Sequence, residues 1–483
     1  MSKKKRLICS LLAAAMLLPA AGCGQKQKTE TQEDDVTLTW FVPGDKQPDH
    51  DIVMEEVNKL IEPKIGAKLD INFIDMGSFA ERMRMNMAAQ SEFDLMFVGY
   101  LNKYDDVVNN GGCLDITEML DDVPALKASI PDYVWDAAKS NGKIYAVPNV
   151  QIMTASFGYN IKKDIVDKYN IDVSAIKNPS DIESVLSTIK ENEPNMYPIQ
   201  PKFGPMLWAY TDYQLLSSIF LAVRKDDPEC KVVNLLDTPE YQEGITKLRE
   251  WFLKGYIRPD IASVTDDNID LNQGKYGVLL NGLKPGLEES FYQSRGYEVV
   301  TAQVTDTFYD GTGALSTMIG VSSTSKHPDK ALKLIELMNT DKEIYNMICF
   351  GIEGKHYLKN DDGKVTYVEN SGWVPKADWK FGNQFNAMLL EGQSDDVWEQ
   401  TEKVNTESAK SRLIGFEFVD DNVVNEISQI ASINDEFYKR MSTGYDDPDT
   451  YLDQYKEKLK LAGIDKVQEE LQKQVDEFLA KNK

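Results

Sequence analysis

Apolar positions change their spacing several times within the first hundred residues. Apolar residues at every second position over 36–42 predict a strand, and helical spacing over 53–61 predicts the helix that follows. The alternation returns over 69–73, residues 79–90 are helix-prone, and the apolar run 95–98 suits a strand buried on both faces. This order of strand, helix, strand, helix and strand predicts an α/β unit with a parallel sheet.

Three short segments follow the expected strands of this unit. They are residues 43–45, 75–77 and 99–100. Ligands of such sheets bind at the carboxyl ends of the strands, so we expect a binding crevice where these segments meet.

A second α/β region follows. A strand-like stretch at 156–160 leads into a helix over 161–169, and the proline-rich segment 193–205 is expected to be a loop. Further strands are expected at 275–280 and 315–321. From about residue 396 the pattern is largely helical, and no internal repeat of solenoid period is present.

The first 35 residues have the pattern of an export signal and a tether. Cations at positions 3–6 precede an apolar run over 7–18, which is too short to span a membrane comfortably. The sequence AAGC then ends at Cys23 and has the form of a lipobox, with Ala20 where leucine is usual. Since a polar stretch follows, we expect a lipid anchor at Cys23. The alternative is an ordinary secretory signal with an incidental cysteine.

The formal net charge of −25 bears on the class of partner. An acidic chain without basic clusters disfavours binding to nucleic acid or directly to anionic lipid. Cys113, Cys230 and Cys349 are widely scattered and odd in number, so they do not form a disulfide framework. A single disulfide between two of them is an open alternative. Because no CxxC is present and the three histidines are far apart, neither a metal site nor a cofactor is expected.

Familiar catalytic motifs are absent from the sequence. It contains no P-loop, HExxH, GxSxG or EF-hand pattern. Gly311 and Gly313 begin a GxGxxG pattern, but Ser316 occupies the third glycine position. Because the chain has many carboxylates, their spacing neither identifies nor excludes a catalytic pair of the kind that glycosidases use. These observations favour a binding protein over an enzyme.

Several stretches resemble the sugar-type extracellular solute-binding proteins of ABC importers. They are the lipobox with its tether, the N-terminal α/β unit, NGKIYAVP at 141–148 and TSKHPDKA at 324–331. GIEGKHY at 351–357 and LAGIDKV at 461–467 resemble an uncharacterised C-terminal region of some Gram-positive members. The resemblance covers nearly all of the chain after the signal.

The resemblance implies an α/β, two-lobe periplasmic-binding-protein-like fold of type II. Each lobe would be a mixed sheet flanked by helices, with a hinge between the lobes and a helical C-terminal extension. The expected divisions are a signal at 1–22, an anchor and tether at 23–35, an N-lobe at 36–149 plus about 297–345, a C-lobe at about 150–296 plus 346–395, and a helical region at about 396–483 that packs on the lobes.

The resemblance also implies a function and a location. The protein would be a monomer, anchored by lipid to the outer face of a Gram-positive cell membrane. It would capture an oligosaccharide between its lobes and deliver it to the transmembrane subunits of an ABC permease. Peptides are the main competing ligand. A secreted carbohydrate-active enzyme and a surface lipoprotein that binds other macromolecules are the remaining alternatives.

A sugar ring presents apolar C–H faces and a rim of hydroxyl groups, which aromatic and polar side chains recognise respectively. Aromatic residues in loops or after strands are therefore the first candidates: Trp373, Trp379, Trp208, Tyr100, Tyr210 and Trp40. Polar candidates in turns or at strand ends are Asp45, Asn149, Asn281 and Glu353. The competing interpretation is a hydrophobic plug for the tryptophans and backbone-capping turns for the polar residues.

Overall fold

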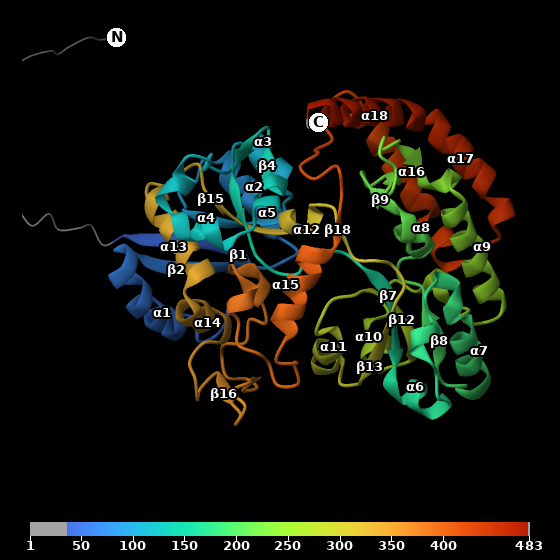
Figure 1. Cartoon of the computed structure of the whole chain (residues 1–483), viewed down its shortest axis with the longest axis horizontal. Helices are drawn as coiled ribbons and strands as arrows, with labels where there is room; N and C mark the ends of the chain where they lie inside the picture. Colours follow the sequence, from blue (N-terminus) through green and yellow to red (C-terminus); the bar gives the residue numbers. More distant parts are fainter. Residues whose placement is uncertain (1–35, 482–483) are drawn as a thin grey trace, which may run out of the picture.

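The computed structural model describes residues 36–481. The signal, the tether and the expected lipid attachment at Cys23 lie outside these residues. Two lobes stand side by side, and a group of C-terminal helices packs at one end of the second lobe (Figure 1).

A five-stranded sheet forms the first lobe, in the order β2-β1-β3-β15-β6. Its strands are β1 (Thr37–Pro43), β2 (Lys68–Ile74), β3 (Leu95–Gly99), β6 (Ala146–Pro148) and β15 (Thr317–Val321). β1 is parallel to β2 and β3, whereas β15 is antiparallel to β3 and β6. Every residue of β3 is buried, as expected for an apolar strand inside a sheet that is covered on both faces.

Helices with one apolar face cover this sheet. They include α1 (His50–Ile65), α2 (Phe79–Ala88), α3 (Tyr104–Asn109), α4 (Pro124–Ser129), α5 (Asp132–Ala137), α13 (Pro328–Thr340) and α14 (Lys342–Phe350). A small hairpin follows α5, with strands β4 (Lys139–Ser140) and β5 (Lys143–Ile144). Its turn is Asn141-Gly142, with φ of 50° and 79°, the backbone that this dipeptide favours in two-residue hairpins.

The second lobe has a four-stranded mixed sheet in the order β13-β7-β12-β8. Its strands are β7 (Phe157–Lys162), β8 (Tyr197–Gln200), β12 (Tyr276–Gly282) and β13 (Val299–Gln303). The helices of this part of the chain are α6 (Lys163–Tyr169), α7 (Glu183–Asn192), α8 (Met206–Asp212), α9 (Pro239–Leu253), α10 (Asn268–Asn272) and α11 (Leu287–Arg295). A small sheet of β9 (Tyr213–Leu215), β10 (Leu221–Arg224) and β11 (Val233–Asn234) joins this lobe to the C-terminal helices.

Three chain segments cross between the lobes and pair with one another. Ala155 pairs with Phe308, which belongs to β14 (Phe308–Tyr309). β14 in turn lies parallel to β18 (Ala409–Lys410). The short helix α12 (Thr312–Leu315) completes the crossing before β15 begins. These paired segments form the connection between the two lobes.

The C-terminal helices share a core with the second lobe. After α15 (Val397–Glu407), the chain forms α16 (Val424–Thr443), α17 (Leu452–Leu461) and α18 (Ile464–Lys481). Buried residues of α16, α17 and α18, such as Phe437, Leu459 and Val475, pack with residues 206–245 in one apolar cluster. These three helices therefore belong structurally to the second lobe and form its upper end in Figure 1.

The two-lobe α/β fold with a helical C-terminal region is confirmed, but two segments lie elsewhere than expected. Residues 346–395, expected in the second lobe, pack on the first, because α14 buries Ile348 and Cys349 in the first lobe's core. Residues 299–303, expected in the first lobe, form β13, which pairs with β7 of the second. A hairpin of β16 (Tyr357–Lys359) and β17 (Val365–Tyr367) accompanies α14 on the first lobe.

Within residues 36–481, no helix is long and apolar enough to cross a membrane. Cys113, Cys230 and Cys349 are buried free thiols.

Candidate functional site

The strand order of the first lobe predicts a ligand crevice at the carboxyl ends of β1 and β3. The chain leaves β1 toward β2 on one side and then returns to β3 on the other side. Such a reversal leaves the ends of the two central strands uncovered, and this is where open α/β sheets bind ligands. The residues that follow these strands are Asp45 and Tyr100.

Tyr100 is presented to solvent by a tight turn after β3. Gly99 is needed there, because its φ of 152° is unusual for other residues and a Cβ atom would lie 2.1 Å from the Ser316 carbonyl oxygen. The Tyr100 amide donates to that same carbonyl oxygen over 2.9 Å, and Asn102 accepts from the Gly99 amide over 3.0 Å. The tyrosine is thus held on a fixed backbone, with 48% of its surface exposed.

Trp379 lies beside Tyr100, although 279 positions separate them in the sequence. Their ring centroids are 6.0 Å apart at 49°, and Phe97 meets the Trp379 ring edge-on from below. Asn149 Nδ2 donates to the Trp379 carbonyl oxygen over 3.2 Å, which fixes the backbone of this turn. The indole remains partly exposed, so Tyr100 and Trp379 form an aromatic surface at the crevice.

Lys380 supplies a cation beneath this surface. Its Nζ donates to the Pro43 carbonyl oxygen over 2.6 Å and lies 4.7 Å from the centre of the Trp379 ring. Burial lowers the pKa of Lys380 from 10.5 to about 8, and the charge of nearby Asp45 opposes that shift. An aromatic face with an ammonium group and an exposed carboxylate nearby is suited to a neutral polyhydroxylated ligand.

Three of the predicted aromatic residues are instead buried in the cores, which corrects their assignment as cleft residues. Trp373 has no exposed surface, and its Nε1 donates to the Ile348 carbonyl oxygen over 3.1 Å. Trp40 is buried in the first lobe with its ring edge-on to Phe381. Trp208 is buried in the second lobe against Trp251. All three behave as the competing hydrophobic interpretation expects.

The remaining candidates do not gather at this crevice. Tyr210 stacks on Phe157 at 4.3 Å in the second lobe, and burial raises its pKa to about 12. Asn281 is half-buried near the end of β12, in the β-ladder opposite Gly158. Glu353 is exposed on the first lobe and accepts from Lys359 Nζ over 2.7 Å, at the β16–β17 hairpin.

The structure therefore brings together four predicted residues, Asp45, Tyr100, Asn149 and Trp379. Sequence reasoning missed Lys380 and Asn102, which complete this arrangement. Lys380 directly follows a chosen tryptophan, and a cation next to an exposed aromatic residue is a usable signal. Asn102 gives no such signal, because its role depends on hydrogen bonds to the end of β3 at Phe97 and Gly99.

Comparison with protein families agrees with this geometry. Residues 51–344 match the model of the bacterial extracellular solute-binding proteins. The chain belongs to that family. Residues 412–480 match a second model, a domain of unknown function named DUF3502.

Two curated relatives carry more specific names. A carbohydrate ABC transporter substrate-binding protein of Streptococcus pneumoniae serotype 4 is 29% identical over 494 residues, covering 99% of each chain. The polygalacturonan/rhamnogalacturonan-binding protein YtcQ of Bacillus subtilis is 21% identical over 397 residues, covering 77% of each chain.

Solved structures extend the similarity to three dimensions. The N-glycan transport solute-binding protein NgtS from Streptococcus pneumoniae has a TM-score of 0.84 at 27% identity, over 93% of this chain and 100% of its own. The complexes of NgtS with Man1GlcNAc and Man5GlcNAc give TM-scores of 0.75 and 0.71, also at 27% identity. They cover 92% and 93% of this chain and 100% of their own.

Proposed function

We propose that this protein captures an oligosaccharide outside the cell and delivers it to the transmembrane subunits of an ABC importer. The match to NgtS over nearly the full length of both chains is the observation that carries the proposal. Because NgtS is named for N-glycan transport and is solved with mannosyl-GlcNAc sugars, a sugar of that class is the first ligand to test.

The crevice of the first lobe supports a carbohydrate ligand. Tyr100 and Trp379 offer apolar ring faces against which a pyranose can stack. Asp45 is exposed nearby and can accept from hydroxyl groups, while Lys380 is buried beneath the indole and supports this surface with its charge. In this proposal the four predicted residues of the crevice contact the ligand or support those that do, while Tyr210 and Asn281 of the second lobe are candidates for contact on closure.

We expect the lobes to close on the ligand about the paired crossing segments. The TM-score is higher for NgtS without a named sugar than for its two sugar complexes. A chain with its lobes apart would give this decline when compared with closed, ligand-bound structures. It supports the expectation that binding brings the lobes of this protein together.

Calorimetry tests the proposed ligand class. Purified protein should bind Man1GlcNAc or Man5GlcNAc, and its radius of gyration in solution scattering should fall on binding. A galacturonic acid oligomer and a short peptide serve as the competing ligands. Binding of the peptide but of neither sugar would overturn the proposal, and sustained consumption of a sugar would assign the protein to the enzymes.

The proposal includes a monomer that is held at the outer face of the cell membrane through a lipid on Cys23. Two acyl chains suffice for stable anchoring. A Cys23→Ser variant should leave the membrane fraction or retain its signal segment. Unchanged partition with membranes would remove the anchor from the proposal.

A further inference from the structure

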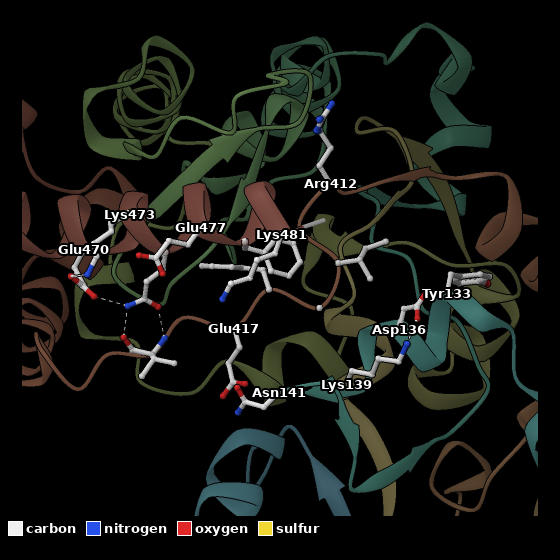
Figure 2. Close-up of a pocket in the computed structure, with 17 residues that line it drawn as sticks. Tyr133, Asp136, Lys139, Asn141, Arg412, Glu417, Glu470, Lys473, Glu477 and Lys481 are labelled. Carbon is white, nitrogen blue, oxygen red and sulfur yellow. Dashed lines mark hydrogen bonds and ion pairs between the residues drawn. The ribbon is translucent and has the colours of Figure 1, made fainter. Parts of the chain in front are cut away.

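The C-terminal helices face the first lobe across a cavity of about 820 Å³. The first lobe contributes α5 and the β4–β5 hairpin, and the C-terminal region contributes residues 412–419 and one face of α18. Figure 2 shows Glu477 and Lys481 of α18 on one side of this space and Asn141 and Glu417 on the other. The volume lies within the range of about 300–1,000 Å³ that is typical of small-molecule sites.

The C-terminal wall of the cavity is held in a defined position. Gln474 of α18 binds both the amide and the carbonyl oxygen of Val419, at 2.9 and 2.8 Å. Phe416 packs edge-on against Phe478 of α18 with ring centroids 5.6 Å apart. Residues 412–419 are therefore fixed to α18, and they present a partly exposed aromatic pair beside carboxylate and ammonium groups.

The wall from the first lobe is also held in place by hydrogen bonds. Asn141 is at the tip of the two-residue turn between β4 and β5, where its side chain is exposed. The Tyr104 hydroxyl of α3 donates to the Ala138 carbonyl oxygen over 2.8 Å, just before this hairpin, and accepts from the Tyr145 amide just after it. This hydroxyl couples the hairpin to α3, which begins four residues after Tyr100.

A smaller cavity joins the two regions. It is lined by Tyr104 and Asp105 of α3 and by residues 310–312 of the crossing segment, and it shares Lys139 and residues 415–417 with the large cavity. Ser140 Oγ of the hairpin donates to Glu417 Oε2, which lines this cavity, over 3.3 Å. Burial raises the pKa of both Asp105 and Glu417, and the charge of a neighbouring carboxylate adds to the shift, from Asp106 for Asp105 and from Asp105 for Glu417. The cavities thus form a continuous path from α3 toward α18.

We infer that the C-terminal region provides an outer subsite for the oligosaccharide, occupied by the sugar units that extend beyond Tyr100 and Trp379. This inference rests on the proposed function and assigns a role to the segment that matches a domain of unknown function. Phe416 and Phe478 provide ring faces for sugar C–H groups, and Glu477 and Asn141 provide groups for hydroxyls. Neither the Glu477 side chain nor the Asn141 side chain has a hydrogen-bond or ion-pair partner among residues 36–481.

The test compares a short and a long sugar, Man1GlcNAc and Man5GlcNAc, in calorimetry with the full mature protein. Glu477→Ala should weaken Man5GlcNAc binding by about ten-fold, the usual loss for a hydrogen bond to a charged group. Asn141→Gly removes the side-chain amide, and glycine adopts the φ of 50° at this position without strain. This variant should weaken Man5GlcNAc binding by about three-fold. Both variants should bind Man1GlcNAc with an affinity within about two-fold of the wild type, because in this proposal the short sugar does not reach the outer subsite.

The matched control is Glu457→Ala, which removes an exposed carboxylate from α17, outside the cavity. This control should change the affinity for neither sugar. All three variants should have the melting temperature of the wild type, because their positions are exposed. Equal losses for both sugars, or no loss for either, would overturn the outer subsite while leaving the proposed function intact. A folded wild-type protein that binds neither sugar would overturn the proposed ligand class and the subsite with it.

Discussion

The two ends of the loop at residues 371–381 place the same residue type in opposite surroundings. Trp373 is completely buried and lies against His50 and Phe73, at centroid distances of 6.3 and 6.1 Å. Trp379, six positions later, is partly exposed and lies beside Tyr100 at the carboxyl end of β3. The inner end of the loop therefore seals the first lobe, whereas the outer end forms a surface that a ligand can reach.

This difference teaches that the position of an aromatic residue relative to the sheet edge determines whether its ring is buried or exposed. Both tryptophans lie in one Gly/Pro-interrupted segment, so their local sequence is nearly equivalent. Of the two, only Trp373 has its Nε1 bonded to a backbone carbonyl inside the lobe, the usual arrangement for a buried indole. Substitutions at the two ends should accordingly divide into losses of stability and losses of affinity.

The largest effect is expected at the inner end. Trp373→Ala should lower the free energy of unfolding by about 3–5 kcal/mol, because it leaves a large cavity in the core. Urea unfolding followed by circular dichroism measures this loss. Sugar affinity, measured on protein that remains folded, should be close to that of the wild type. A strong loss of affinity with intact stability would place Trp373 in the binding surface.

A smaller effect, on affinity, is expected at the outer end. Trp379→Ala removes a stacking face worth roughly 1–2 kcal/mol and should weaken sugar binding about ten-fold. Trp379→Phe keeps a ring and should recover part of the affinity, and calorimetry with Man1GlcNAc compares the two. If Trp379→Ala instead destabilised the protein as much as Trp373→Ala did, the contrast between the ends of the loop would disappear.

The smallest effect concerns pH and involves Lys380. Its pKa is lowered to about 8 in the folded protein from an ordinary value of 10.5, so between these values the unfolded chain binds more protons. Lys380 therefore makes stability rise with pH across this interval. The free energy of unfolding of the wild type, relative to Lys380→Met, should increase between pH 7 and pH 9.5.

Lys376→Met is the control for this measurement, because it removes an exposed lysine from the same loop. Its difference from the wild type should not change in the same direction. A constant difference for Lys380→Met as well would mean that Lys380 titrates alike in the folded and unfolded chains.

The fold could be predicted further from sequence than the site could. Period-two and helical spacing over residues 36–98 identified the first unit, because strands and helices that bury one face must repeat apolar residues at fixed intervals. The assignment of residues 346–395 to a lobe was wrong. The apolar face of α14 shows that the helix packs against something, but not which of two lobes supplies the partner.

The candidate site was predictable where a residue directly follows a strand. Asp45 and Tyr100 were proposed in this way, and the structure places them after β1 and β3, since a sheet gathers its strand ends at one edge. Trp379 reaches that edge through a tertiary contact, and no periodic signal separates it from Trp373. Lys380 escaped notice because its position under the aromatic surface depends on the Pro43 carbonyl oxygen, far away in the sequence.

The core of the first lobe joins the two ends of a long stretch of chain, from Leu38 in β1 to Ala387 beyond the loop. An exported polypeptide crosses the membrane N-terminus first. β1 therefore cannot complete its packing until most of the chain has followed. Pairing of such distant segments carries a large loop-closure entropy and is slow relative to local folding. Until residues 373–387 arrive, the first lobe lacks part of its apolar cover and is exposed to aggregation. The second lobe has the same dependence, since Met206 shares its core with Val475 near the end of the chain.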